Sequence, residues 1–354
     1  MKVVVACGGT GGHAFPGLAV AEELRRRGHE VTVWDSGRDI ESSVMKRWTG
    51  EVFSTGARQI SPRNVVSILR SFFRCRKELK RSRPDALLAM GSYSSLPPVL
   101  AARSRGVPVY LHEANTVPGR AVDFLSRFAK KVAISFDVTA RYLTDCETVV
   151  TGLPVRADIA SGTRIEGIPE NAFVVFVTGG SQGAHAVNGL ASEALTMMAE
   201  ELRRRGGAAR PLYVLHQTGV ADEGPVMAAY AAAKVPARVK AFEDRMADAF
   251  ATAELVIARA GASTCFELAV CGKPALLIPL PTALRNHQHF NADAFVSKGA
   301  ADEADQAMLT ARQLCAYLLA RYDAPERLTA MATKMKALGE PGAAGKVADM
   351  VEGR

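Results

Sequence analysis

The chain has 354 residues and a formal net charge of +8, and 48% of its residues are hydrophobic and 23% charged. This length is more than one ordinary hydrophobic core needs and predicts two domains, while the composition excludes a disordered or fibrous chain. No apolar run reaches the roughly 20 residues that cross a bilayer, so the sequence also excludes a membrane-spanning helix.

The positive charge is concentrated in the first half of the chain. Residues 1–155 carry 23 Lys and Arg against 14 Asp and Glu, whereas the remaining residues carry 21 against 22. A basic half of this kind indicates a domain that faces an anionic surface, either nucleic acid or lipid headgroups.

The N-terminus and the cysteines both indicate an intracellular protein. Residues 1–7 read as a short buried strand, whereas a signal peptide has a longer apolar region and a small-residue cleavage site. The six cysteines include no C-x-x-C pair, so neither a disulfide framework nor a zinc site is expected.

The first half of the chain alternates predicted strands and helices. Lys2–Cys7 is predicted to be a strand, residues 8–13 a glycine turn, and Pro16–Arg27 a helix that begins with Pro16 in its first turn. Further strands are predicted at residues 30–34, 86–89, 107–112, 131–134 and 148–151. This alternation is typical of a parallel sheet covered by helices on both faces.

Residues 58–83 form a basic stretch with apolar residues between the charges. It holds nine Lys and Arg against one acid, Glu78. The predicted membrane patch on this helix consists of Val65, Leu69, Phe72 and Phe73 with the flanking Arg70, Arg74, Arg76 and Lys77. Such a helix can lie in the headgroup layer of an anionic membrane, or it can be a core-packing helix with a solvated basic face. Nucleic acid ranks lower, because the aromatic residues are not spaced as stacking platforms.

The second half repeats the pattern of the first. A strand at residues 174–178 precedes a second glycine turn, Gly179 to Gly183, and a helical run at residues 184–198. More strands are predicted at residues 211–217, 238–241, 255–258 and 275–279, and residues 154–169 are the predicted linker. We therefore expect two Rossmann-like α/β domains that face each other across a cleft, the second covering residues 165–338.

Each glycine turn is a candidate phosphate site. Between a strand and a helix, glycines leave backbone N–H groups exposed at a helix N-terminus, where phosphate can approach. Neither turn matches G-x-G-x-x-G or G-x-x-x-x-G-K-[ST], which disfavours NAD and P-loop chemistry. A single turn of this kind can be only a tight connection, but two at equivalent places favour a functional role. His13 closes the first turn and lies where a phosphate or a sugar hydroxyl would meet it.

Several segments together resemble the MurG family. They are Gly8-Gly9-Thr10-Gly11-Gly12-His13-Ala14-Phe15-Pro16-Gly17, His112-Glu113-Ala114-Asn115, Gly152-Leu153-Pro154-Val155-Arg156, Gly179-Gly180-Ser181-Gln182-Gly183-Ala184, Arg259-Ala260-Gly261-Ala262-Ser263-Thr264-Cys265-Phe266-Glu267 and His287-Gln288-His289-Phe290-Asn291-Ala292. They occur in the family's order and spacing from residue 3 to about residue 300.

The resemblance implies the GT-B glycosyltransferase fold and an inverting transfer that forms a β-1,4 linkage. The family moves N-acetylglucosamine from UDP-N-acetylglucosamine to the undecaprenyl-linked acceptor lipid I in peptidoglycan synthesis. An enzyme of this kind is expected at the cytoplasmic face of the membrane. The fold further implies a C-terminal helix at residues 339–354 that packs back on the first domain, residues 1–157.

The resemblance also implies the ligands. The acceptor pyrophosphate is expected to bind Gly9, Thr10, Gly11, Gly12 and His13. The donor is expected to bind Thr10, Gly11, Gly12, Asn115, Arg156, Ser181, Gln182, Glu243, Ala262, Ser263, Thr264, Glu267 and Gln288. Among these, Glu267 is assigned to the ribose hydroxyls and Gln288 to the N-acetylglucosamine.

The catalytic base has two candidates, His13 and Glu113, between which the sequence does not choose. No D-x-D sequence is present, so we expect no metal and no other cofactor, and glycine-turn amides would stabilise the departing UDP. Glu267 also has a structural reading, because Thr264-x-x-Glu267 matches a capping box. The family motif favours the ribose role over that reading.

Departures from the family pattern leave other functions open. Ser92 and Leu96 in the Gly-Gly-Tyr-x-Ser-Gly-Pro segment, and Ala114 in place of Gln, change the acceptor half. The segment from Phe242 to Met246 departs in the donor half. The alternatives are the same fold with a glycolipid or small-metabolite acceptor, a sugar-nucleotide epimerase or hydrolase, and a non-catalytic nucleotide-binding module.

Overall fold

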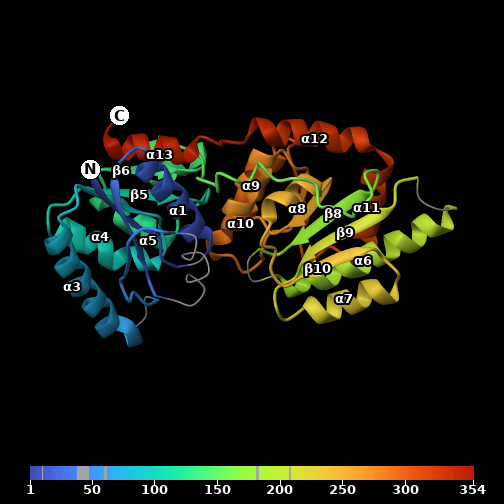
Figure 1. The fold of residues 1–354 in the computed structure, drawn as a ribbon, viewed down its shortest axis with the longest axis horizontal. Coiled ribbons are helices and arrows are strands. Elements are labelled where there is room, and N and C mark those ends of the chain that lie inside the picture. The colour runs from blue at the N-terminus through green and yellow to red at the C-terminus, as the bar shows by residue number, and fades with distance from the viewer. Residues whose placement is uncertain (10, 38–47, 60–61, 181–182, 207–208) are drawn as a thin grey trace. The chain divides into compact units, whose positions relative to one another are not determined.

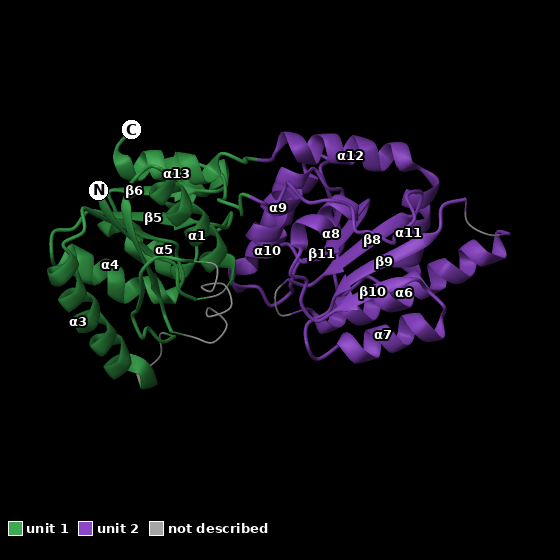
Figure 2. Ribbon diagram, viewed as in Figure 1, with its two compact units in different colours: residues 1–157, 340–354 green, residues 158–339 purple. Residues whose placement is uncertain are grey.

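The structure is a computed structural model that describes residues 1–9, 11–37, 48–59, 62–180, 183–206 and 209–354. The described residues fall into two compact units (Figure 2): unit 1 is Met1–Ala157 with Glu340–Arg354, and unit 2 is Asp158–Gly339. Each unit contains a parallel sheet with helices packed on it (Figure 1). The predicted class, an α/β chain with two parallel-sheet domains, is confirmed.

The sheet of unit 1 has the strand order β3-β2-β1-β4-β5-β6-β7, and the paired neighbours run parallel. Its strands are β1 (Lys2–Ala6), β2 (Glu30–Asp35), β3 (Val52–Ser54), β4 (Ala86–Ala89), β5 (Val109–Glu113), β6 (Lys131–Ile134) and β7 (Thr148–Val150). The helices are α1 (Gly11–Arg26), α3 (Val65–Ser82), α4 (Leu96–Arg103), α5 (Arg120–Leu125) and α13 (Ala343–Glu352). Successive β1 residues enter opposite cores: Val3 and Val5 pack with α1, and Val4 with α3 and α4.

The sheet of unit 2 has the order β10-β9-β8-β11-β12-β13, and its paired neighbours are also parallel. Its strands are β8 (Phe173–Thr178), β9 (Leu212–Gln217), β10 (Ala237–Lys240), β11 (Leu255–Ala258), β12 (Ala275–Leu277) and β13 (Asp302–Glu303). The helices are α6 (His185–Arg204), α7 (Glu223–Ala232), α8 (Met246–Thr252), α9 (Ala262–Cys271), α10 (His287–Val296), α11 (Ala311–Asp323) and α12 (Pro325–Ala337).

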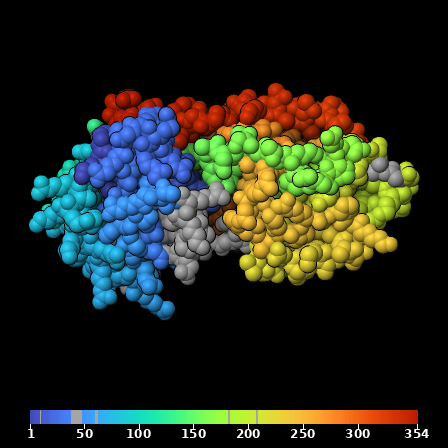
Figure 3. Space-filling view, viewed as in Figure 1, coloured from blue at the N-terminus to red at the C-terminus, as the bar shows by residue number. Residues whose placement is uncertain are grey.

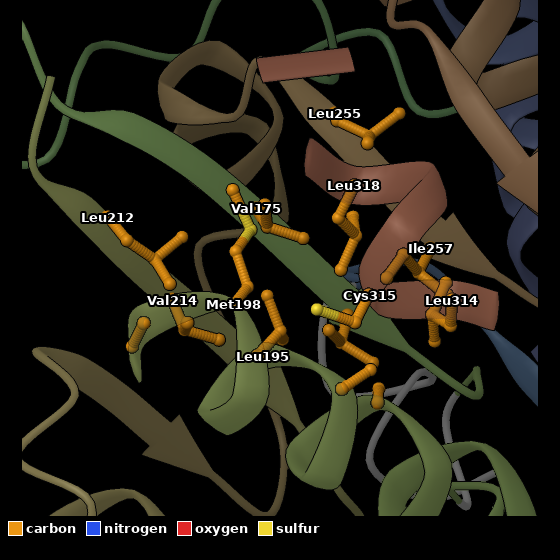
Figure 4. Close-up of a cluster of buried hydrophobic side chains, with 14 of the residues drawn as sticks. Val175, Leu195, Met198, Leu212, Val214, Leu255, Ile257, Leu314, Cys315 and Leu318 are labelled. Atoms are coloured by element: carbon orange, nitrogen blue, oxygen red, sulfur yellow. The ribbon is translucent and has the colours of Figure 1, made fainter. Parts of the chain in front are cut away.

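The main core of unit 2 lies between the sheet and the helices α6 and α11. Figure 4 shows strand residues such as Val175 and Ile257 facing Leu195 of α6 and Leu318 of α11. These side chains are fully buried. Because both faces of a parallel sheet are covered, its strands read as continuous apolar runs, which is the pattern that predicted them.

The C-terminal helix α13 packs on α1 within unit 1. Val347 and Val351 are buried in the same cluster as Leu24 of α1. At its polar edge, Nη1 of Arg27 lies 2.5 Å from Asp349 Oδ1 and 2.9 Å from Glu352 Oε2. Apolar burial and these two ion pairs together attach the end of the chain to the first helix.

Helix α1 begins earlier than the sequence predicts. It starts at Gly11 rather than Pro16, so Pro16 lies inside the helix. A proline there removes one backbone hydrogen bond and its ring approaches the preceding turn. The hydrogen bond that Pro16 cannot make is the one to the carbonyl of Gly12, four residues earlier in the first turn of the helix.

Candidate functional site

The first glycine turn joins β1 to α1 at the carboxyl edge of the unit 1 sheet. Gly9 has φ +129°, a conformation that residues with a side chain rarely adopt. A Cβ on Gly8 would lie 2.6 Å from the backbone N of Ser36, so the chain passes close to the end of β2. Gly11 and Gly12 form the first turn of α1, whose N–H groups cannot bond within the helix. Thr10, which is predicted to bind both the acceptor pyrophosphate and the donor, lies outside the described residues.

His13 is oriented by the end of β4. Its Nδ1 lies 2.8 Å from the carbonyl oxygen of Met90, which immediately follows β4. A carbonyl only accepts hydrogen bonds, so Nδ1 carries the proton. In a neutral imidazole held this way, Nε2 is the basic nitrogen.

The segment after β4 holds the first glycine turn in place. Oγ of Ser92 donates to the carbonyl of Gly8 at 2.9 Å, and Oγ of Ser94 donates to the same oxygen at 2.5 Å. Ser92 itself has φ +71°, a conformation that costs about 1 kcal/mol or more for a residue with a side chain. Sequence reasoning treated Ser92 only as a departure, although two serines after a buried strand were a signal for such bonding.

Glu113 ends β5 and is fully buried. Its Oε1 accepts N–H bonds from the backbone of Asn115 at 2.8 Å and from the Asn115 amide at 3.1 Å, and its Oε2 accepts from the N–H of Gly119 at 3.0 Å. Burial raises the pKa of the Glu113 carboxyl, and these donors oppose that shift. Both oxygens therefore hold the loop after β5, and the Asn115 amide takes part in the same arrangement.

Arg156 reaches the second turn of α1 from the segment after β7. Its guanidinium lies over the ring of Phe15, with 5.2 Å from Cζ to the ring centroid. Phe15 is two residues beyond His13 on the same helix. Unit 1 thus brings Gly9, His13 and Arg156 to one region around the N-terminus of α1.

The second glycine turn joins β8 to α6 in unit 2. Gly183 has φ +75°, and a Cβ there would lie 1.9 Å from the carbonyl oxygen of Thr218, so only glycine fits. Nε2 of Gln217, the last residue of β9, donates to the carbonyl of Gly180 at 2.7 Å. Ser181 and Gln182, the predicted diphosphate ligands, lie outside the described residues.

Glu243 lies beside this turn, after β10. Its carboxylate is buried and pairs with Lys240 at 3.0 Å and with Arg238 at 3.3 Å. Its backbone N–H donates to Oε1 of Gln217 at 3.2 Å. Because the carboxylate is engaged by two cations and the N–H by Gln217, the group that Glu243 offers a ligand is its backbone carbonyl.

Helix α9 presents the third predicted donor segment. It begins at Ala262 with Gly261 as the N-cap, and Gly261 supplies no side-chain cap. The capping-box reading of Thr264 and Glu267 is therefore wrong, because Thr264 is the third residue of the helix and not its N-cap. Ser263, Thr264 and Glu267 lie on the first two turns and are partly exposed.

Helix α10 is anchored beside α9. The fully buried Asn291 donates through Nδ2 to the carbonyl of Ala260 at 3.2 Å. Oε1 of Gln288 accepts the backbone N–H of Leu280 at 3.0 Å, so its amide NH₂ is the group with which Gln288 can donate to a ligand. The two residues before the helix, Arg285 and Asn286, both have φ near +54°. Paired left-handed residues of this kind cluster at ligand-binding sites.

Helix α3 carries the predicted membrane patch. Val65, Leu69 and Phe73 are 51%, 53% and 60% exposed, and Val66, which the prediction omitted, is 60% exposed. Phe72 differs from the prediction, because it is half-buried and packs on the core of unit 1. The helix lies at the surface of unit 1, in light blue in Figure 3. Among the described residues, no helix combines the length and apolar character needed to cross a membrane.

Comparison with known proteins covers both halves of the chain. Residues 3–134 match the glycosyltransferase family 28 N-terminal domain, and residues 174–347 match the family's C-terminal domain. The UDP-N-acetylglucosamine–N-acetylmuramyl-(pentapeptide) pyrophosphoryl-undecaprenol N-acetylglucosamine transferase of Geobacter sulfurreducens is 36% identical, covering 99% of this chain and 97% of that protein. The Agrobacterium fabrum protein of the same name is also 36% identical, with 99% and 93% covered.

The chain is also similar to solved structures over its full length. Acinetobacter baumannii MurG is 30% identical with a TM-score of 0.79, covering 100% of this chain and 99% of that one. The UDP-N-acetylglucosamine 2-epimerase of Neisseria meningitidis, bound to UDP-N-acetylglucosamine, has a TM-score of 0.73 over both full chains but only 15% identity. That second likeness shows a shared fold and nothing about the reaction.

The tight fit of the second glycine turn can be tested by substitution. Gly183→Ala should lower the free energy of unfolding by roughly 3 kcal/mol or more, because it adds a clash with Thr218 to the left-handed backbone. Gly167→Ala is the matched control, since Gly167 has φ +84° with open space around it and should lose only about 1–2 kcal/mol. Equal losses in urea denaturation would contradict the close approach.

Proposed function

This chain belongs to the MurG family of UDP-N-acetylglucosamine–N-acetylmuramyl-(pentapeptide) pyrophosphoryl-undecaprenol N-acetylglucosamine transferases, and on that basis we propose that it transfers N-acetylglucosamine from UDP-N-acetylglucosamine to lipid I. The observation that carries the proposal is the family match over both halves of the chain. The motif residues follow the carboxyl ends of strands in both sheets.

The proposed donor site lies in unit 2. Backbone N–H groups of the second glycine turn and of the first turn of α9 bind the diphosphate and stabilise the charge on departing UDP. Ala262, Ser263 and Thr264 form the first turn of α9, and Ser181 and Gln182 belong to the second glycine turn. Glu267 accepts the two ribose hydroxyls, and the Gln288 amide donates to the sugar.

The proposed acceptor site lies in unit 1. The first glycine turn binds the acceptor pyrophosphate, and Arg156 lies over Phe15 in the helix that follows this turn. His13 is the base that we favour, because the Met90 carbonyl fixes its Nδ1 proton and makes Nε2 the proton acceptor. Glu113 is the positioning residue, because its oxygens accept the N–H groups of the following loop. The acceptor hydroxyl loses its proton to His13 as it attacks the anomeric carbon, and UDP leaves.

We also propose that α3 holds the enzyme on the cytoplasmic face of an anionic membrane, where a lipid-linked acceptor lies. The exposed Val65, Val66, Leu69 and Phe73 form an apolar strip along the helix. Basic residues flank it, and each contributes about 1 kcal/mol near an anionic leaflet.

The reaction is tested by following labelled N-acetylglucosamine from its UDP donor to a lipid I analogue. Wild-type protein should transfer the label, and His13→Gln should lower kcat by roughly 100-fold or more while leaving UDP affinity nearly unchanged. Transfer only to other acceptors would favour the glycolipid or metabolite alternative. Sugar epimerisation or UDP release without acceptor would favour the epimerase or hydrolase. Wild-type kcat in His13→Gln would reject His13 as the base.

The ribose contact of Glu267 predicts a loss of nucleotide affinity. Glu267→Ala should weaken UDP binding by about 1–3 kcal/mol, the scale for lost hydrogen bonds to a charged group. Calorimetric titration with UDP measures it. Glu193→Ala, which removes an exposed acid from α6 in the same unit, should change nothing. Unchanged affinity in Glu267→Ala would remove Glu267 from the site.

Membrane attachment through α3 predicts a loss of vesicle binding. Changing Leu69 and Phe73 together to serine should release the protein from vesicles that contain phosphatidylglycerol, because the exposed apolar strip is lost. Co-sedimentation measures this. Val150→Ser, an exposed apolar residue on β7, is the control and should bind as wild type does. Binding by the double variant would show that α3 is not the contact.

A further inference from the structure

The start of α6, which directly follows the second glycine turn, is hydrogen-bonded to the loop that follows β9. Nδ2 of Asn188 donates to the carbonyl of Thr218 and to Oδ2 of Asp222, both at 2.7 Å. Asn188 lies in the first turn of α6, and Asp222 is the N-cap residue of α7. The start of α6 and the β9–α7 loop are therefore one hydrogen-bonded assembly.

A buried histidine anchors this assembly. Because the Asn188 amide donates through Nδ2, its Oδ1 is the acceptor, and Nε2 of His216 donates to it at 3.2 Å. Nδ1 of His216 then accepts the Tyr230 hydroxyl at 3.0 Å. Burial lowers the pKa of His216 to about 3, so the ring stays neutral. A neutral ring donates from Nε2 and accepts at Nδ1, as these two hydrogen bonds require.

A second histidine ends this hydrogen-bonded chain at the surface. His185 is the first residue of α6, two positions after Gly183, and its side chain is 92% exposed. Its Nδ1 lies 2.8 Å from Oδ1 of Asp222. Hydrogen bonds from Asn188 and His185 lower the pKa of Asp222, so it is a carboxylate that accepts from Nδ1. The ring is thereby fixed with Nε2 on the side away from Asp222.

We propose that His185 is a further ligand of the donor diphosphate, donating Nε2–H as an imidazolium to a phosphate oxygen and stabilising UDP as it departs. This inference rests on the proposed function and concerns the same donor site. Nδ1 already donates to Asp222, so the ring must carry both protons to donate from Nε2. Asp222 is the charged group that faces the ring, and His216 on β9 is linked to Asp222 through Asn188.

The test compares UDP with uridine, which lacks the phosphates. His185→Gln should weaken UDP binding about tenfold in calorimetric titration, on the scale of one charge-assisted hydrogen bond, and leave uridine binding unchanged. His185→Arg, a permanent cation, should restore UDP affinity.

A matched control removes a cation from the far end of the same helix. Arg204 is 73% exposed and pairs with Glu201, and Arg204→Gln should change neither affinity. Unchanged UDP binding in His185→Gln would overturn the inference, and so would equal losses for UDP and uridine, which indicate a structural role. Failure of the wild-type protein to bind UDP would instead reject the proposed function itself.

Discussion

Close approach of one backbone to another at the two glycine turns is the constraint on which both candidate sites depend. Gly8 lies against the end of β2, and Gly183 lies against the carbonyl of Thr218. A side chain at either place would push the helix N-terminus away from the sheet edge. Residues from neighbouring strand ends then hold each turn: Ser92 bonds Gly8, and Gln217 bonds Gly180. The result in each unit is a helix start whose amides face a possible anion.

Buried ionisable groups around these turns mostly position the backbone. Both carboxylate oxygens of Glu113 accept N–H groups of the loop after β5. Glu243 is paired with two cations, and Asp222 accepts hydrogen bonds from Asn188 and His185. A buried carboxylate needs such partners, since an unpaired one is costly to desolvate. His13 is half-buried and His185 is exposed, and the partner of each ring decides which nitrogen carries the proton: a carbonyl for His13 and a carboxylate for His185.

The shared fold does not distinguish this chain from relatives with other chemistry. The Neisseria 2-epimerase covers the whole chain at 15% identity, so the architecture is compatible with more than one reaction on a UDP-sugar. The family assignment instead rests on sequence similarity over both halves of the chain. Departures from the family pattern, such as Ser92 and Ala114, lie in loops of unit 1, and Ser92 supports the first glycine turn through its hydroxyl.

The sequence by itself determined the alternation of buried strands and helices, both glycine turns and the family, because these depend on local periodicity and on short motifs. It missed the short strands β3 and β13, which have too few residues to show a period. Only the tertiary structure decided that Glu113 bonds Gly119, that α9 starts at Ala262 and so has no capping box, and that His185 meets Asp222, 37 residues away. Those contacts depend on which strand ends become neighbours in the sheet, and hydrophobic pattern does not encode that order.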